Sequence, residues 1–346
     1  MQLCRSGHGG GLRGPFAAVG ASHGVRTAKE GLLLTNYFYW RYLFWGELTG
    51  IIFLAVGLIS VRKQLSFKPD QWPVLGRVFV AASLALFGAG HLVGAQFMVP
   101  LVPAWMPARL FWVYFVGLAL IAASASMVAM KHVRLSATLL GITFFIFVLT
   151  IHLPAVLRTP YDRFRWAVMV RDLVFGMGAW ALAGAEMEEH QVPGARAWIA
   201  GCRTVFGVVL VFYAVEHFLH PGFALGVPLE LPTPAWVPLP SLWGHVVGVM
   251  LLVCGVSILI NKHARAAATW LGFTITLVVV FYYLPMIVPV KLPSEMNLAV
   301  DYIADTLLFA GNIFLLAGAL PAARSLSSVP LNPRTEQAEG LSELRV

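Results

Sequence analysis

The apolar residues of this chain fall into nine blocks, and the length of these blocks constrains the fold more than any other feature. The hydrocarbon core of a bilayer is ~30 Å thick, and a helix that rises 1.5 Å per residue crosses it in about twenty residues. Inside lipid only helices and closed barrels satisfy every backbone group, and these blocks lack the two-residue alternation of barrel strands. We therefore predict an all-α integral membrane protein with nine transmembrane helices, at residues 39–61, 77–98, 110–130, 135–157, 166–185, 198–220, 242–260, 266–288 and 298–320.

The composition supports a lipid environment. Charged residues make up 12% of the chain and hydrophobic residues 59%, whereas a soluble domain carries about 25% charged residues. The net charge of +8 fits the excess of Lys and Arg that membrane proteins carry in their cytoplasmic loops.

No basic stretch alternates with aromatic residues, which argues against nucleic-acid binding. The three cysteines form no CxxC pair, and we predict no metal site. The expected partner is the lipid bilayer.

A segment of the chain is repeated after 131 residues. The sequence PAWMPARLFWVYFVG begins at Pro103, and PAWVPLPSLWGHVVG begins at Pro234. The same offset relates the basic segments 131–134 and 262–265, so the repeat covers more than one helix. We predict two tandem four-helix units that cross the membrane in the same direction, because each unit has an even number of spans. The predicted domains are a flexible tail (1–38), a lone first helix and linker (39–74), the first unit (75–187), the second unit (188–321) and a flexible tail (322–346).

The distribution of Lys and Arg predicts the orientation. One set of loops carries ten basic residues and the opposite set carries five, so the first set is expected in the cytoplasm. The N-terminus then lies outside and the C-terminus in the cytoplasm, with a bacterial inner membrane as the expected location. Five further basic residues lie in the N-terminal tail or at the start of the first span, which opposes this orientation: Arg5, Arg13, Arg26, Lys29 and Arg41.

These motifs resemble the DoxX/DoxX-like membrane family. The resemblance rests on spans that end in FGAGH or YAVEH, on the VPAW- and TPAW-type loops, and on the short hairpins KHVR and KHAR. It covers about residues 77–185 and again 205–320, although the tandem arrangement and the extra first helix depart from the usual single unit. The resemblance implies a four-helix bundle and an accessory or quinone-linked role beside other subunits of a redox complex.

Ionisable residues inside apolar spans are costly, and they mark either function or paired contacts. The first such group contains His91, Glu216, His217 and His220. Residues 217 and 220 are expected on one helix face, and His91 and His217 occupy equivalent helices. One interpretation is a paired-histidine site between the units that binds a quinone head group, or haem iron as a second choice. The other is that each imidazole only hydrogen-bonds a neighbouring helix.

The second group contains the matched acids Asp172 and Asp305, with Arg171 beside the first. A carboxyl group within a span is either paired or protonated. These residues form either an inter-helix clamp or a proton relay. His152 is replaced by Tyr283 in the second unit, and we interpret both as amphipathic side chains that reach toward the interface.

No soluble-enzyme motif occurs, so whether the protein is an enzyme stays open. We expect an accessory or quinone-interacting subunit of a membrane redox complex. Quinone is the favoured cofactor, and haem is the less favoured one. The alternatives are a non-catalytic scaffold or lipid-binding module, and a small-solute or proton-coupled transporter.

Overall fold

The computed structural model describes residues 25–227 and 231–321, and these ranges are helical without β-strands. Nine of the described helical segments are long and apolar enough to cross a membrane, which confirms the predicted all-α class and the nine spans. The spans are Leu43–Val61, Pro69–Val93, Arg109–Ala129, Val133–Arg158, Arg163–Glu189, Ala195–Leu219, Pro240–Leu259, Ala264–Ile287 and Ser294–Ala319.

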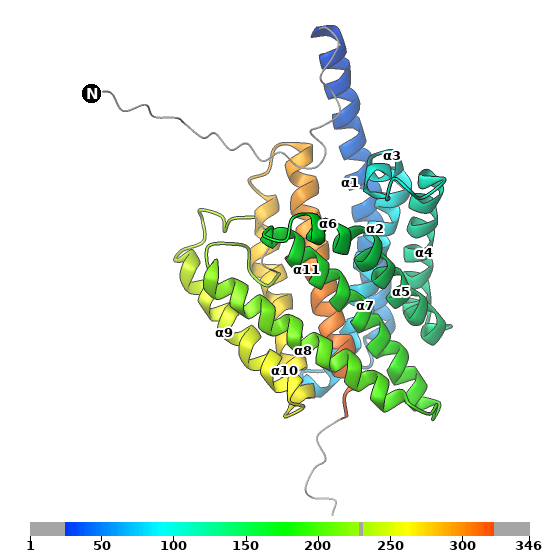
Figure 1. Ribbon diagram of the computed structural model, residues 1–346, viewed down its shortest axis with the longest axis vertical. Coiled ribbons are helices and arrows are strands. Elements are labelled where there is room, and N and C mark those ends of the chain that lie inside the picture. The colour runs from blue at the N-terminus through cyan, green and yellow to red at the C-terminus, as the bar shows by residue number, and fades with distance from the viewer. Residues whose placement is uncertain (1–24, 228–230, 322–346) are drawn as a thin grey trace, which may run out of the picture.

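The first helix begins earlier than predicted. Helix α1 covers Val25–Val61, so residues 25–38 are helical rather than part of a flexible tail. This stretch contains no proline, and the helix continues without a break into the apolar span. Figure 1 shows α1 extending beyond the end of the bundle. The remainder of the predicted N-terminal tail (1–24) and the predicted C-terminal tail (322–346) lie outside the described residues.

Two helices form the centre of the bundle (Figure 1). Helices α7 (Arg163–Glu189) and α11 (Pro293–Ala319) pack against each other. Their apolar windows are 72% and 78% buried, against 33% for the peripheral helix α4 (Arg109–Ala129). Helix α7 also packs on α5 (Val133–Phe147) and α8 (Ala195–Leu219). Side chains on α7 and α11 are therefore well shielded from lipid, as are those of the span Pro69–Val93, which is also 72% buried.

The remaining helices are arranged in a similar way on the two sides of this centre. Helix α11 packs on α10 (Ala264–Val278) and on α2 (Leu75–Val93), just as α7 packs on α5 and α8. The outer pairs are α2 with α4, and α8 with α9 (Pro240–Leu259). Helix α1 lies against α2. Short helices complete the connections: η1 (Pro69–Val74), α3 (Ala95–Met98), η2 (Val99–Leu101), α6 (Leu153–Arg158) and η5 (Leu284–Ile287).

Unusual backbone features recur 131 residues apart. A π-helical turn, η3 (Val148–His152), follows α5, and a second, η4 (Val279–Tyr283), follows α10. Left-handed backbone conformations are costly for residues other than glycine. Three such pairs nevertheless occur at this spacing, namely Ala108 with Leu239, Met130 with Asn261, and His132 with His263. The backbone therefore follows the same course through these turns in both segments.

Candidate functional site

A group of charged side chains, largely removed from the surface, joins the two central helices. Arg171 of α7 donates through Nη1 to Oδ2 of Asp305 on α11, at 2.5 Å. The same guanidinium donates through Nε and Nη2 to Oδ1 of Asp172, both at 3.0 Å. Each carboxylate is thus held by a charge-assisted hydrogen bond, which is stronger than a neutral one. The predicted group of Arg171, Asp172 and Asp305 is brought together in the structure.

His152 completes this group from the π-helical turn η3. Its Nε2 atom lies 2.8 Å from Oδ2 of Asp172. The imidazole donates this hydrogen bond when Asp172 is ionised, because an ionised carboxylate only accepts. The interpretation of His152 as a side chain reaching toward the interface is therefore wrong. We call His152, Asp172, Arg171 and Asp305 the buried network. A π-helical turn shifts the following residues around the helix axis, and η3 ends at His152 itself.

The buried network lies deep within the spans. Asp172 follows the first residue of α7 by nine positions, roughly 14 Å along the helix axis. Asp305 follows the start of its span, Ser294, by eleven positions, roughly 16 Å. Both carboxyl groups thus lie well inside helical segments that are long enough to cross a ~30 Å hydrocarbon core. The side chain of Asp172 is 8% exposed and that of Arg171 is 16% exposed.

The buried network contains more acids than permanent cations. Arg171 carries one positive charge, while Asp172 and Asp305 carry two negative charges when both are ionised. The network becomes neutral when one proton is held by His152 or by a carboxyl group. Uncompensated charge in a low-dielectric interior costs several kcal/mol, so a retained proton lowers the free energy of the folded protein.

Two buried tyrosines face the buried network from the second half of the chain. The Tyr213 hydroxyl of α8 donates to the Ala167 carbonyl of α7 at 2.9 Å, and the tyrosine is within electrostatic range of Arg171. The Tyr283 hydroxyl of η4 donates to the Leu225 carbonyl at 2.8 Å and is within range of Asp305. Both hydroxyl groups are thus satisfied by backbone, which leaves the charge balance to the four network residues.

A second ion pair connects the start of α7 to the end of α8. Arg163 Nη1 donates to Oε2 of Glu216 at 3.0 Å, and the Arg163 guanidinium lies 4.5 Å from the ring centroid of Phe223. Glu216 therefore belongs to a different cluster from the predicted acids Asp172 and Asp305. From the sequence, Arg163 was one of the five basic residues of the less basic set of loops, with no predicted partner.

His217 is buried next to this ion pair. Its side chain is 1% exposed, and the Gly226 amide donates to Nε2 at 3.1 Å. Gly226 has a φ of 93°, which is readily available to glycine and turns the loop back over the end of α8. Because Nε2 accepts, the neutral ring carries its proton on Nδ1, which has no hydrogen-bond partner within the described part of the chain.

The structure gives His91 and His217 partners in their own halves. His91 Nδ1 bonds the Phe87 carbonyl one turn earlier, at 2.8 Å, and its Cβ lies against Gly117 of α4. His217 packs in the same way against Gly248 of α9. The geometry matches the packing interpretation, and it does not bring the two imidazoles together as a paired site.

His220 lies outside the helix that was expected to carry it. Helix α8 ends at Leu219, and His220 has φ −133° and ψ 59°. The cause is Pro221, which disfavours helical geometry at the preceding residue. His217 and His220 therefore do not share a helix face. Among the described residues, no group of three or more His, Cys, Asp or Glu side chains is arranged to hold a metal ion.

Comparison with known proteins gives one family match. A family model described as "Domain of unknown function (DUF8561)" matches residues 80–182. Neither a curated protein nor a solved structure matches the chain. The matched region contains His152, Arg171 and Asp172 but not their partner Asp305.

Proposed function

We propose that this protein handles protons within the membrane, and that the buried network holds one exchangeable proton. The observation that carries the proposal is a single guanidinium bonded to two carboxylates deep in the spans, with an imidazole on one of them. Imidazole and carboxyl groups exchange protons readily, whereas Arg171 stays charged. Arg171 therefore fixes the geometry, and the other three side chains share the proton.

We further propose that this proton serves a quinone-linked redox assembly in which the chain is an accessory subunit. Reduction of a quinone consumes protons and oxidation of the quinol releases them, so a buried proton carrier suits such a partner. The resemblance to DoxX-like proteins supports this setting. It also supports a tandem duplication of a four-helix unit, in line with the matched turns 131 residues apart. We propose a bacterial inner membrane location, with the N-terminus outside and the C-terminus in the cytoplasm.

The test uses the full chain purified in mild detergent with its native partners. We expect extractable quinone, and quinol-dependent turnover that Asp305→Asn lowers at least tenfold while the helical content is kept. Gly201→Ala is the matched control, because a Cβ at this position meets no atom within 4 Å. A folded Asp305→Asn variant with unchanged turnover would contradict the proton role. Absence of both quinone and a haem absorption band would contradict the redox setting alone.

A second candidate function is proton-coupled transport of a small solute. The specific observation in its favour is that the same span is interrupted in both halves, by η3 before Pro154 and by η4 before Pro285. Interrupted helices at corresponding positions of two repeats are the usual location of a transporter's binding site. Solute-dependent proton flux in proteoliposomes would support this candidate, and Asp172→Asn should abolish the flux.

A non-catalytic scaffold remains the alternative to both candidates. In that case the buried network acts only as a clamp between α7 and α11. Substitutions in the network would then lower thermal stability without altering proton uptake, turnover or flux.

A further inference from the structure

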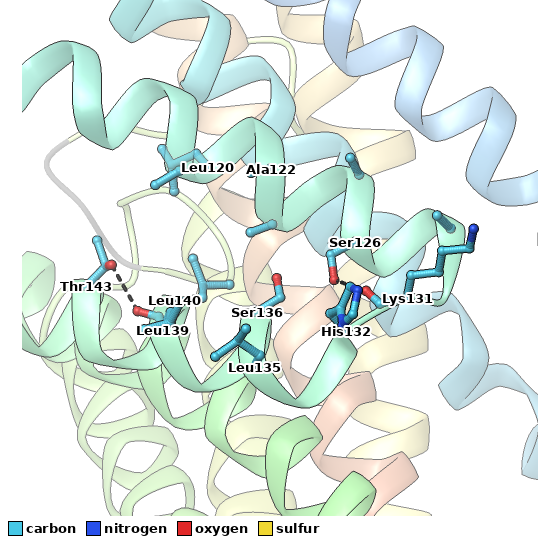
Figure 2. A pocket seen from close by; sticks show the side chains of 14 residues that line it. Leu120, Ala122, Ser126, Lys131, His132, Leu135, Ser136, Leu139, Leu140 and Thr143 are labelled. Atoms are coloured by element: carbon cyan, nitrogen blue, oxygen red, sulfur yellow. Dashed lines mark hydrogen bonds between the residues drawn. The ribbon is translucent and has the colours of Figure 1, made fainter.

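A lipid-facing groove runs between α4 and α5, away from the buried network. It has a volume of about 450 Å³, within the range of small-molecule sites. Figure 2 shows Leu120, Ala122 and Ser126 on one helix facing side chains of the next, with Lys131 and His132 at the turn that joins them. On α4 the floor is made by the exposed small residues Ala122, Ala125 and Ala129. The groove is thus apolar along its length and basic at one end.

We propose that this groove binds an anionic phospholipid, with an acyl chain between α4 and α5 and the head group at Lys131. The lining residues of α4 extend from Ala119 to Ala129, which corresponds to roughly 15 Å. This is half of the ~30 Å hydrocarbon core, the depth of one leaflet. The basic turn therefore lies where a head group would be when the chain occupies the groove.

The charge of the turn selects an anionic head group. Lys131 and Arg134 are exposed, and the ion pairs of the described residues all involve other side chains. The turn is held in place by Ser126, whose hydroxyl donates to the Lys131 carbonyl at 2.5 Å. A fixed turn with two free cations attracts acidic lipids, at about 1 kcal/mol per Lys or Arg near the surface, or about fivefold in binding.

Ser136 places a hydroxyl group in the wall of the groove. Its Oγ atom is buried and has no hydrogen-bond partner among the described residues. Residue 136 lies four positions after His132 on α5, roughly 6 Å deeper into the membrane. A hydroxyl donor at this depth matches the ester carbonyls below a phospholipid head group.

The second half of the chain lacks the small-residue floor. At the positions 131 residues later, α9 carries the exposed side chains of Val253 and Val256, followed by Ile260 at its C-terminus. The cation is kept as Lys262, which is exposed at the equivalent turn. The two segments thus carry the same Lys at the turn but different side chains on the floor. The second segment therefore supplies a control for each change made in the first.

The experiment is native mass spectrometry of the full chain, titrated with phosphatidylglycerol or phosphatidylcholine of identical acyl chains. We expect phosphatidylglycerol to be retained at least fivefold better. Lys131→Gln should lower its retention about fivefold, while Lys262→Gln should leave it unchanged. The triple variant Ala122→Val, Ala125→Val, Ala129→Ile, which carries the side chains of the second half, should lower retention of both lipids. Circular dichroism checks that each variant is folded.

Three results would overturn the proposal. They are equal retention of the two lipids by the wild type, equal losses for Lys131→Gln and Lys262→Gln, and unchanged retention in a folded triple variant. Retention of a quinone or a peptide in place of a phospholipid would also overturn it. Because the groove is separate from the buried network, none of these outcomes depends on the proton proposal.

Discussion

The two π-helical turns share a backbone but differ in chemistry. In the first half, η3 presents His152 to Asp172, beside Arg171. In the second half, the equivalent residue Tyr283 bonds the Leu225 carbonyl instead. The residue before Asp305 is Ala304, where the first half has Arg171. Titratable and cationic groups are therefore concentrated on one side of the α7–α11 contact, and Asp305 reaches across it to Arg171.

This difference shows how two segments with matching turns can hold a single charge centre at the contact of α7 and α11. Two equivalent Arg–Asp–His groups would place two sets of charges in the membrane, each with its own desolvation cost. With one guanidinium shared by Asp172 and Asp305, the charges at the α7–α11 contact are held in one compact group. The interrupted helix occurs in both halves, and of the two turns only η3 contributes a side chain to the buried network.

Arg171→Gln is expected to have the largest effect. It leaves two buried carboxylates without a permanent cation, and loss of one partner of a buried ion pair costs about 3–5 kcal/mol. The double variant Arg171→Gln, Asp305→Asn removes the excess acid, so it should recover about 0.5–3 kcal/mol relative to the single variant. Thermal unfolding in detergent measures both. A double variant less stable than Arg171→Gln would contradict the charge-balance argument.

Glycine contacts of the central helices should give the next largest effect. A Cβ at Gly178 of α7 would overlap Oδ1 of Asn312 and lie 2.6 Å from its Cβ, and a Cβ at Gly311 of α11 would lie 2.9 Å from the Val80 amide nitrogen. We expect Gly178→Ala and Gly311→Ala each to cost about 1–3 kcal/mol. Gly201→Ala, in open space, should be neutral or slightly stabilising. Equal unfolding temperatures for all three would show that the halves are not tightly packed at α7 and α11.

The two π-helical turns can be compared directly by His152→Gln and Tyr283→Phe. Each variant weakens or removes one buried hydrogen bond, which costs about 0.6–1.7 kcal/mol within a membrane. Only His152→Gln removes a titratable group from the buried network, so it alone should abolish proton-coupled activity. Comparable activity in both variants would mean that the asymmetry of the turns has no functional role.

The smallest effect is expected where the central helices begin. Asp162 caps α7, with its Oδ1 accepting from the Arg165 amide at 3.3 Å, whereas α11 follows Leu292 and has no side-chain cap. The hydrogen bond from the Arg165 side chain lowers the pKa of Asp162 below its ordinary value of 3.8. Asp162→Ala should cost about 1 kcal/mol at neutral pH.

The pH dependence of this cap follows from the lowered pKa. A depressed carboxyl pKa stabilises the folded state above the ordinary value, and the stabilisation is lost as the pH falls through the folded-state value. The difference in unfolding temperature between wild type and Asp162→Ala should therefore shrink below about pH 4. A difference independent of pH would show that the cap acts only through backbone geometry.

The nine spans could be predicted from the sequence, because the length and apolar character of a segment are enough to indicate that it crosses a bilayer. It also identified Arg171, Asp172 and Asp305 as a group, since acids within spans need partners. It could not place His152, because the π-helical turn that ends at this residue has no clear signal in residue spacing. The role of Arg163 depends on the loop that brings Phe223 over it, a long-range contact. His91 and His217 looked like a pair because their positions in the repeat match, but equivalent positions in a repeat need not be neighbours in space.

The central claim is that the buried network of the folded protein holds one proton at neutral pH. Solid-state NMR of the full chain in lipid bilayers tests it directly, with ¹³C-labelled Asp and ¹⁵N-labelled His to report the protonation of the carboxyl and imidazole groups. The account predicts one proton among His152, Asp172 and Asp305 in the wild type, in addition to the proton of the neutral imidazole, and no additional proton in Asp305→Asn. A wild type with both carboxylates ionised and a neutral His152 would contradict it.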